Sequence, residues 1–567
     1  MPSLISTDIP DRCYLANGHD SMTLPRCANE APRTIRVEDI LDIGYTVPDQ
    51  VRQSLRRVSQ FGLKEIWLGG SPAQHNRWDH SVGAFVVGVI WLHVLKGRVP
   101  KHCLRWPFDS WEKIHATLGT SLLLHDYGHL PFAHMMDEVL QNINWLPQGN
   151  FHGLEAAVVE HRFSEPAMDE TWKWLAGAVL NVKSKWPITQ ANTNKLVQQF
   201  IVGAHGAPWL QAIVNSPIDA DKIDYLRYDG DFLRKCSFPV HHRLLLDEPS
   251  QWLSAFLADQ EVNHAGLLCL HGRSAAAAAD LWRERVFLYD RLYLAPDLRV
   301  PERMALEIVQ QFLIRSTMST VFLKSCSIPD VLSFSDRLIA ETSHNPNDVL
   351  RLKYETVRDT MLALLPNIKG TKLEFSVLKR MIDAIASWPG IDRTYRDFLK
   401  NCFSCLEELN HPDERKVDLG NQKGLRDIQY SSLVREPILF AREDYEHARE
   451  ILRLLQHYYA RELLIDLVRL PWVLAGPRGP SQDRRSSEYR GPSILVPKGP
   501  IATWGPGKRA AVPLTDEVVA TIERPYCRLL VIAPGMANSP RGAYLWDRVR
   551  SVLLEGNIQL IERREDE

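Results

Sequence analysis

The sequence predicts an all-α protein that carries a small α+β appendage at its C-terminal end. Apolar residues recur every three or four positions over most of residues 49–475, which is the spacing of helices with one buried face. Strand patterns are short by comparison. One is a candidate hairpin at 262–274, and two apolar runs at 528–534 and 558–562 flank a helical stretch at 542–555. That last order of elements predicts the α+β unit.

Changes in composition divide the chain into five segments. Nearly continuous helix is expected from 301 to about 470, and a stretch rich in Gly, Pro and Ser follows, with seven Lys or Arg against two acidic residues. Such a composition is typical of a flexible linker. The predicted division is a leader at 1–48, a helical core at 49–300, a helical lobe at 301–475, a basic linker or loop at 476–513 and the α+β unit at 514–567.

Charge and cysteine content exclude several classes of protein. The 67 basic and 69 acidic residues leave a net charge of −2, so no global field draws the chain to nucleic acid. The basic linker is the one segment that could touch nucleic acid, and a disordered linker is the preferred interpretation. Nine scattered cysteines indicate a reducing compartment. The close pair Cys402 and Cys405 is expected to be buried in a helix.

No membrane association is predicted. The N-terminal residues lack the basic and apolar regions of a signal peptide. The most apolar run, 82–95, is short for a bilayer span and contains His93. We therefore expect a buried helix there and a cytoplasmic protein.

Histidines concentrate between residues 75 and 137. This stretch contains the motifs HNRWDHSVG and LLLHDYGHLPFAHMMD and holds eight of the 20 histidines. Imidazole and carboxylate groups together are ligands for a divalent metal that activates water. Neighbouring His125 and Asp126 can reach one ion if the helix ends beside them, and Gly128 provides that ending. His93 and His115 are expected to pack between helices, whereas His75 has no assigned role.

A second polar segment, PIDADKIDYLRYD, supplies further candidates. Asp221, Lys222, Tyr225 and Asp229 share one face of a predicted helix. A solvated helix with charge pairs four residues apart explains the same pattern. The alternative is a metal-binding face, and the N₂O₂ set then consists of His80, His125, Asp126 and Asp221. Such a set suits Mn, Fe, Mg, Ni or Zn with open positions for water and a phosphate oxygen.

Other residues would act around the ion. His134 and Asp137 lie three residues apart on a predicted helix, so the carboxylate can orient the imidazole. A charged imidazole beside a metal-bound phosphate can stabilise it and protonate a leaving oxygen. Cations that could neutralise a polyphosphate are Arg77, Lys222, Arg285 and Arg291. Surface arginines on a long helix explain Arg285 and Arg291 equally well.

The ordered motifs HNRxxHS, HDxGHxPFxHxxD and DxDKxDYxxxD resemble the HD-domain superfamily, and most closely its deoxynucleoside triphosphate triphosphohydrolase (dGTPase-like) branch. The resemblance covers roughly residues 50–295 and makes 49–300 the catalytic domain. It implies an all-helical HD core and attack of water on the α-phosphorus of a dNTP. The products would be the deoxynucleoside and intact triphosphate. The enzyme would act in dNTP-pool control or antiviral defence.

The resemblance also implies a role for each matching residue. The metal ligands would be His80, His125, Asp126 and Asp221, and His134 would be the acid/base group, supported by Asp137 and His152. The residues in contact with substrate would be His129, Gln60, Arg77, Lys222, Tyr225, Asp229, Arg285, Arg291 and Tyr293. Family members assemble as tetramers or hexamers, so a homo-oligomer is expected here.

Three alternatives remain open at this point. The family position tied to a nucleotide effector carries Ala295 here, so activation by an effector is an open expectation. The chain could also be another HD phosphohydrolase, such as a nucleotide monophosphatase, an alarmone hydrolase or a nuclease. A nucleotide-sensing scaffold is an alternative of a different class.

Overall fold

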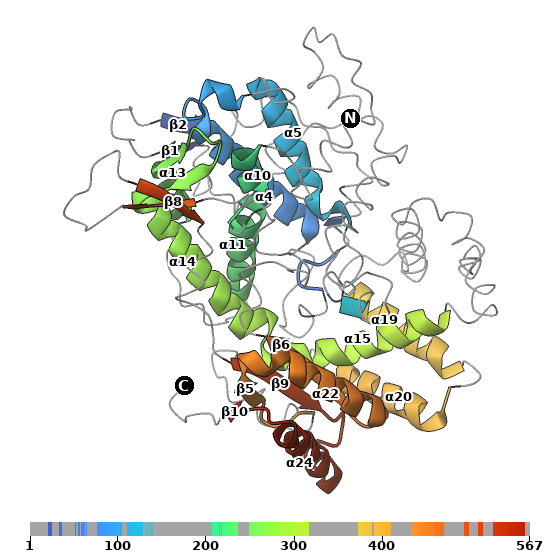
Figure 1. Ribbon diagram of the computed structural model, residues 1–567. Coiled ribbons are helices and arrows are strands. Elements are labelled where there is room, and N and C mark those ends of the chain that lie inside the picture. The colour runs from blue at the N-terminus through green and yellow to red at the C-terminus, as the bar shows by residue number, and fades with distance from the viewer. Residues whose placement is uncertain are drawn as a thin grey trace, which may run out of the picture.

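A computed structural model of the chain shows a mainly helical protein with small sheets (Figure 1), which confirms the predicted fold class. The structure describes residues 21–24, 33–36, 76–104, 110–128, 207–214, 216, 218–235, 249–316, 372–387, 391–409, 433–469, 493–497, 509–513 and 526–561, with separate positions in 52–64 and 132–139. Within the predicted leader, strands β1 (Ser21–Leu24) and β2 (Arg33–Arg36) form an antiparallel pair.

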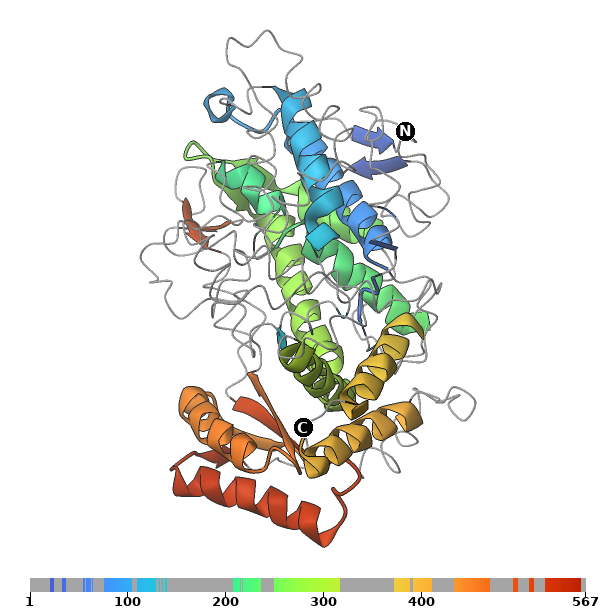
Figure 2. The ribbon, with the colours of Figure 1, turned by 90° about the vertical axis from the view of Figure 1, so that its right-hand side faces the viewer.

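Helix α4 (Arg77–Leu95) lies at the centre of the first half of the chain. It packs against α5 (Trp111–Leu124) and α11 (Ala220–Lys235), as Figures 1 and 2 show. Within the described residues, α10 (Pro208–Val214), α13 (Pro249–Ala258) and α14 (Gly272–Leu288) also contribute to this core. Trp78, Phe85 and Trp91 on α4 are fully buried, so the hydrophobic effect holds α4 inside the bundle.

The apolar character of α4 comes from this burial. Among the described residues it is the one helix long and apolar enough to cross a membrane, and 89% of that window is buried inside the protein. The predicted buried helix is confirmed, and it begins at Arg77, earlier than the apolar run alone indicated. A core helix of a globular protein has these properties.

A second apolar cluster follows the first along the chain. It forms where α15 (Pro296–Ser316) packs against α19 (Lys372–Ser387) and α20 (Arg393–Leu409). Cys402 and Cys405 are buried there as free thiols, which confirms their predicted place in a helix.

A four-stranded antiparallel sheet forms the base of the molecule in Figure 2, with the order β10-β5-β9-β6. Its helices are α22 (Tyr445–Tyr458) and α24 (Pro540–Glu555). The predicted strand, helix and strand of the C-terminal unit correspond to β9 (Tyr526–Ile532), α24 and β10 (Leu560–Ile561).

The same sheet corrects the expectation of helix up to residue 470. Strands β5 (Ile438–Ala441) and β6 (Leu464–Arg469) lie in that range and both pair with β9. The apolar spacing of 445–470 fits a helical period, but α22 ends at Tyr458 and the residues after it pair with the later strand. A distant partner in the sequence therefore decides the structure of a short apolar run.

A second sheet joins distant segments. The predicted hairpin is confirmed as β3 (Gln260–Val262) and β4 (Leu268–Leu270). Strand β7 (Ser493–Pro497) pairs in parallel with β4 and antiparallel with β8 (Arg509–Pro513). Two strands thus lie within the segment expected to be a flexible linker. The five segment boundaries themselves stay predictions.

Candidate metal centre

The N-terminal turns of helices α4 and α11 lie next to each other. The side chain of Asn76 accepts a hydrogen bond from the backbone of Asp79 at 3.1 Å and caps α4, which places His80 in its first turn. Asp219 accepts from the backbone of Lys222 at 2.8 Å and caps α11, with Asp221 in the first turn. Such caps satisfy amides that have no partner inside the helix.

The third contributor is the end of α5. After Leu124 the chain continues as a 3₁₀ turn, η4 (His125–Gly128). A 3₁₀ turn separates neighbouring side chains by a wider angle than an α-helix does. His125 and Asp126 nevertheless both border one point, since Oδ1 of Asp126 lies 3.6 Å from Nε2 of His125.

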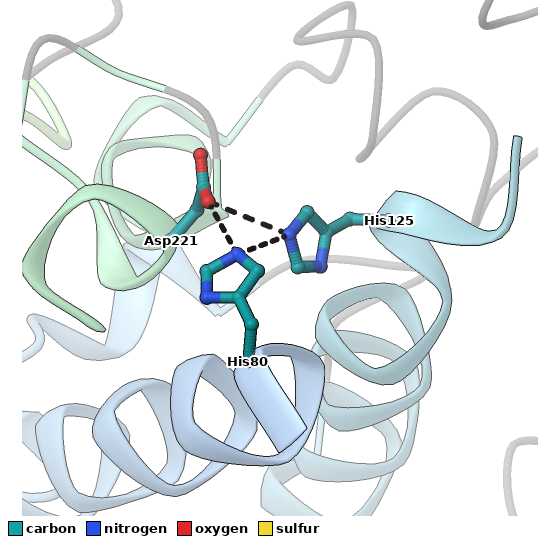
Figure 3. Close-up of side chains that lie close together, drawn as sticks. All are labelled: His80, His125 and Asp221. Carbon is teal, nitrogen blue, oxygen red and sulfur yellow. Dashed lines mark hydrogen bonds and ion pairs between the residues drawn. The ribbon is translucent and has the colours of Figure 1, made fainter. Parts of the chain in front are cut away.

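Three ligand atoms meet where these elements converge (Figure 3). Nε2 of His80 lies 2.9 Å from Oδ1 of Asp221, and Nε2 of His125 lies 3.4 Å from the same oxygen. The two Nε2 atoms are 3.3 Å apart. This trio is the group of His, Cys, Asp and Glu among the described residues whose ligand atoms are close enough to hold one ion.

The other ring nitrogens decide where the protons are. Nδ1 of His125 lies 2.7 Å from the backbone oxygen of Leu122. Nδ1 of His80 lies 2.9 Å from Oδ2 of Asp224. Both oxygens accept, so in a neutral imidazole the proton sits on Nδ1 and the lone pair on Nε2. Both lone pairs then face the Asp221 carboxylate.

The donor set fits a divalent ion. Ligand atoms about 2.1 Å from an ion in tetrahedral or octahedral geometry are roughly 3.0–3.4 Å apart. The three separations here run from 2.9 to 3.4 Å. Converging lone pairs and a carboxylate repel one another unless a positive charge lies between them, so the site is suited to a cation of the predicted type.

Electrostatics agree with this interpretation. Burial lowers the pKa of His80, but hydrogen bonds to Asp221 and Asp224 outweigh it and raise that pKa to about 10. Burial would raise the pKa of Asp221, yet the protonated rings of His125 and His80, in the absence of an ion, donate hydrogen bonds that hold it well below its usual value. The surroundings stabilise positive charge at the point where the three side chains meet.

Asp126 borders the centre and is shared with an arginine. Its Oδ1 lies 3.6 Å from Nε2 of His125, and its Oδ2 lies 3.7 Å from Nε2 of His80. Nη1 of Arg77 donates to that Oδ2 at 2.9 Å, and each side chain of the pair is only 4% exposed. Asp126 as a fourth ligand and Arg77 as a phosphate contact both stay predictions.

The other predicted phosphate cations are held by neighbours. Nζ of Lys222 lies 2.5 Å from Oδ2 of Asp219. Arg285 is buried, and its guanidinium lies 5.6 Å from the ring centre of Tyr289. The alternative of a solvent-exposed arginine is therefore wrong for Arg285. Asp229, ten residues after the cap Asp219, is buried too, which excludes a fully solvated helix.

The residues predicted to face a sugar form one cluster. The Tyr293 hydroxyl, from the π-helical turn η6 (Tyr289–Tyr293), donates to Asp229, and its ring lies 6.3 Å edge-on from that of Tyr225. The ring of Phe61 lies 5.9 Å from Tyr293, next to the buried Gln60. Within the described part of the chain, the Tyr225 hydroxyl and Oε1 of Gln60 are buried without a hydrogen-bond partner. Such atoms in a buried place are suited to a polar ligand.

Several predicted residues cannot be placed. His129, His134, Asp137 and His152 lie outside the described residues, as does the side chain of Arg291. The predicted acid/base group therefore stays a prediction.

The sequence analysis missed two carboxylates. Asp224 binds His80, and Asp219 both caps α11 and holds Lys222. Asp224 follows Asp221 by three residues and so lies on an adjacent part of the helix face. The three-residue spacing could be read from the sequence, but the contact with His80 depends on which helix packs against that face of α11.

The comparisons with known proteins give distant similarities, and no family model matches the chain. A zebrafish (Danio rerio) protein named deoxynucleoside triphosphate triphosphohydrolase SAMHD1 is 25% identical over 312 residues, 50% of this chain and 45% of that protein. The uncharacterized protein YwfO of Bacillus subtilis is 27% identical over 180 residues, 31% of this chain and 33% of that protein. The chain thus spans less than half the length of these curated relatives.

Among solved structures, a phosphohydrolase from Bacteroides thetaiotaomicron aligns with 89% of this chain and 96% of its own, with a TM-score of 0.43 and 12% identity. The motifs resemble those of HD-domain phosphohydrolases, and the distant similarity to a protein named as a dNTP triphosphohydrolase agrees with that resemblance.

Proposed function

We propose that the chain is a metal-dependent dNTP triphosphohydrolase. The observation that carries this proposal is the shared face of α11, which holds Asp221 at the candidate metal centre and Tyr225 in the aromatic cluster. One helical turn of about 5.4 Å separates them. The phosphate attached to the 5′ carbon of a nucleotide and its sugar are separated to a similar extent. A nucleotide with its α-phosphate at the centre therefore places its sugar beside Tyr225.

Each group has a task in this proposal. A bound divalent ion would polarise the α-phosphate and lower the pKa of a coordinated water. Arg77, Lys222 and Arg285 would bind the negatively charged phosphates, with Arg291 and His129. His134 would hold a proton for the leaving oxygen, with Asp137 and His152 orienting its ring.

The aromatic cluster would recognise the sugar. The Tyr225 hydroxyl, which is buried without a partner among the described residues, would face the 2′ position, where a ribose hydroxyl leaves less space. Asp229, bonded by the Tyr293 hydroxyl, would accept from the 3′ hydroxyl. Gln60 would contact the sugar or base.

The wider assignment follows from the same relationship. The similarity to a protein named as a dNTP triphosphohydrolase supports this substrate class. In this proposal the protein is a cytoplasmic homo-oligomer, tetrameric or hexameric. It responds to a nucleotide effector and acts in dNTP-pool control or antiviral defence.

Product analysis tests the proposal. The protein is incubated with Mn²⁺ and each dNTP or NTP in turn, and the products are separated by ion-exchange chromatography. Deoxynucleoside and triphosphate are expected from dNTPs, with much slower turnover of NTPs. A nucleoside monophosphate with pyrophosphate, or inorganic phosphate as the first product, would contradict the proposal. Turnover of nucleoside monophosphates or nucleic acid alone would favour another HD phosphohydrolase.

A matched variant tests the sugar assignment. Tyr225→Phe removes the hydroxyl and keeps the ring, so metal binding should persist while the preference for dNTPs over NTPs changes. An unchanged preference would place the sugar elsewhere.

A further inference from the structure

A carboxylate without a role in the predicted chemistry lies behind His80. Asp224 is 4% exposed, and its Oδ2 lies 2.9 Å from Nδ1 of His80. It comes from α11, one turn after Asp221, so two carboxylates of the same helix contact opposite nitrogens of one imidazole. Because Nδ1 and Nε2 point away from each other across the ring, Asp224 cannot share the ion that Nε2 faces.

A glycine makes room for this carboxylate. Gly83 lies three residues after His80 on α4, so both share one helix face. A Cβ built at Gly83 would overlap Oδ1, Cγ and Oδ2 of Asp224. Any other residue at this position would displace the carboxylate from His80 or push α4 away from α11.

We propose that Asp224 is a positioning residue for the metal centre, seated by Gly83, and that it holds His80 with its Nε2 lone pair directed at the ion. The inference rests on the proposed function. The carboxylate accepts only from an Nδ1 that carries a proton, so it selects the tautomer whose Nε2 can bind metal. It also fixes the rotation of the ring, and its charge makes the imidazole a stronger donor to the ion.

The structure provides a matched set of variants. Asp224→Asn keeps the shape of the side chain but removes its charge, and its amide can present a donor to Nδ1. Gly83→Ala keeps Asp224 but places a methyl group where its carboxylate lies. Gly88→Ala is the control, because it makes the same change on the same helix and its Cβ would meet Leu122 and not a carboxylate.

Metal binding is measured directly, independently of turnover. The protein and its variants are stripped of metal and titrated with Mn²⁺, Fe²⁺, Ni²⁺ and Zn²⁺ separately by calorimetry, with circular dichroism to check folding. We expect Asp224→Asn and Gly83→Ala to bind roughly 10–100-fold more weakly, as for other groups that orient a metal ligand. Gly88→Ala should lower the melting temperature without weakening metal binding.

The outcomes separate this inference from the proposed function. A folded Asp224→Asn that binds metal as tightly as the unmodified protein would overturn the inference and leave the metal centre in place. Equal weakening by Gly88→Ala and Gly83→Ala would overturn the role given to Gly83. An unmodified protein that binds none of the four ions would overturn the metal centre, and the inference with it.

Discussion

Two pairs of histidines lie between the same two helices and have opposite electrostatic properties. The rings of His80 and His125 are 5.2 Å apart with an interplanar angle of 78°, and those of His93 and His115 are 5.5 Å apart with an angle of 83°. Within each pair one ring comes from α4 and the other from α5 or the turn after it. The ring geometry is therefore nearly the same in both pairs.

The neighbours of the two pairs differ. Asp221 and Asp224 raise the pKa of His80 to about 10, against the effect of burial. Burial, with a smaller effect from the positive charges of His93 and Lys96, lowers the pKa of His115 to about 3. Two neighbouring histidine rings from packed helices are therefore not sufficient to bind a cation. The carboxylates that α11 brings to the first pair decide which pair can hold a metal.

The largest expected effect is on turnover, and it separates the two pairs. His125→Ala removes a ligand atom, so kcat for dNTP hydrolysis should fall at least ~1000-fold, the scale of losing a metal or a catalytic group. His93→Gln should stay within about fivefold of the unmodified protein. The measurement is steady-state hydrolysis by folded variants. Similar losses in both variants would break the distinction between the pairs.

Asp126→Ala should cost the most stability. It leaves the buried Arg77 without its carboxylate, and breaking a buried ion pair costs about 3–5 kcal/mol. The control is Glu462→Ala, which breaks the more exposed pair with Arg541 and should cost much less stability, since solvent screens that pair. Urea unfolding of both variants measures the difference. Equal small losses would show that Arg77 does not depend on Asp126.

Metal should stabilise the protein through the first pair alone. At a free Mn²⁺ concentration 100 times the dissociation constant, binding adds about 2.7 kcal/mol to the unfolding free energy. Chelation with EDTA should remove this gain, and His80→Ala should never show it, whereas His115→Gln should. Thermal unfolding with and without Mn²⁺ is the measurement. A gain that persists in His80→Ala would place the ion elsewhere.

The smallest expected effect is the pH dependence contributed by the second pair. The pKa of His115 in the folded protein, about 3, lies below its ordinary value of 6.5. Below pH 6.5 the unfolded chain therefore takes up a proton that the folded protein does not. The stability that neutral His115 contributes is complete above pH 6.5 and is lost as the pH falls from 6.5 towards 3.

His115→Gln removes this dependence. Relative to the unmodified protein, its unfolding free energy should improve by ~1 kcal/mol between pH 7.5 and pH 5.5. Urea unfolding at the two pH values measures this change. An identical difference at both pH values would show that His115 titrates normally in the folded protein.

The sequence predicted most of the helical fold because the helices have strong local signals. The apolar run of α4 is an example. Strands β5 and β6 were missed because their pairing partner, β9, lies far away in the sequence. Short apolar runs fit either period, and tertiary pairing decides between them.

The candidate site shows the same limit. His80, His125 and Asp221 were predicted together from their motifs, and the structure brings them together. The role of Asp224 was out of reach, because it depends on α11 packing so closely on α4 that Gly83 admits a carboxylate. Periodicity identifies the face on which a residue lies but not the neighbour that this face meets.

Anomalous diffraction from crystals grown with Mn²⁺ tests the central claim most directly. We expect one strong peak among Nε2 of His80, Nε2 of His125 and Oδ1 of Asp221, and none at the His93 and His115 pair. A peak at that second pair, or a Mn²⁺-saturated crystal without a peak at the first, would contradict the account.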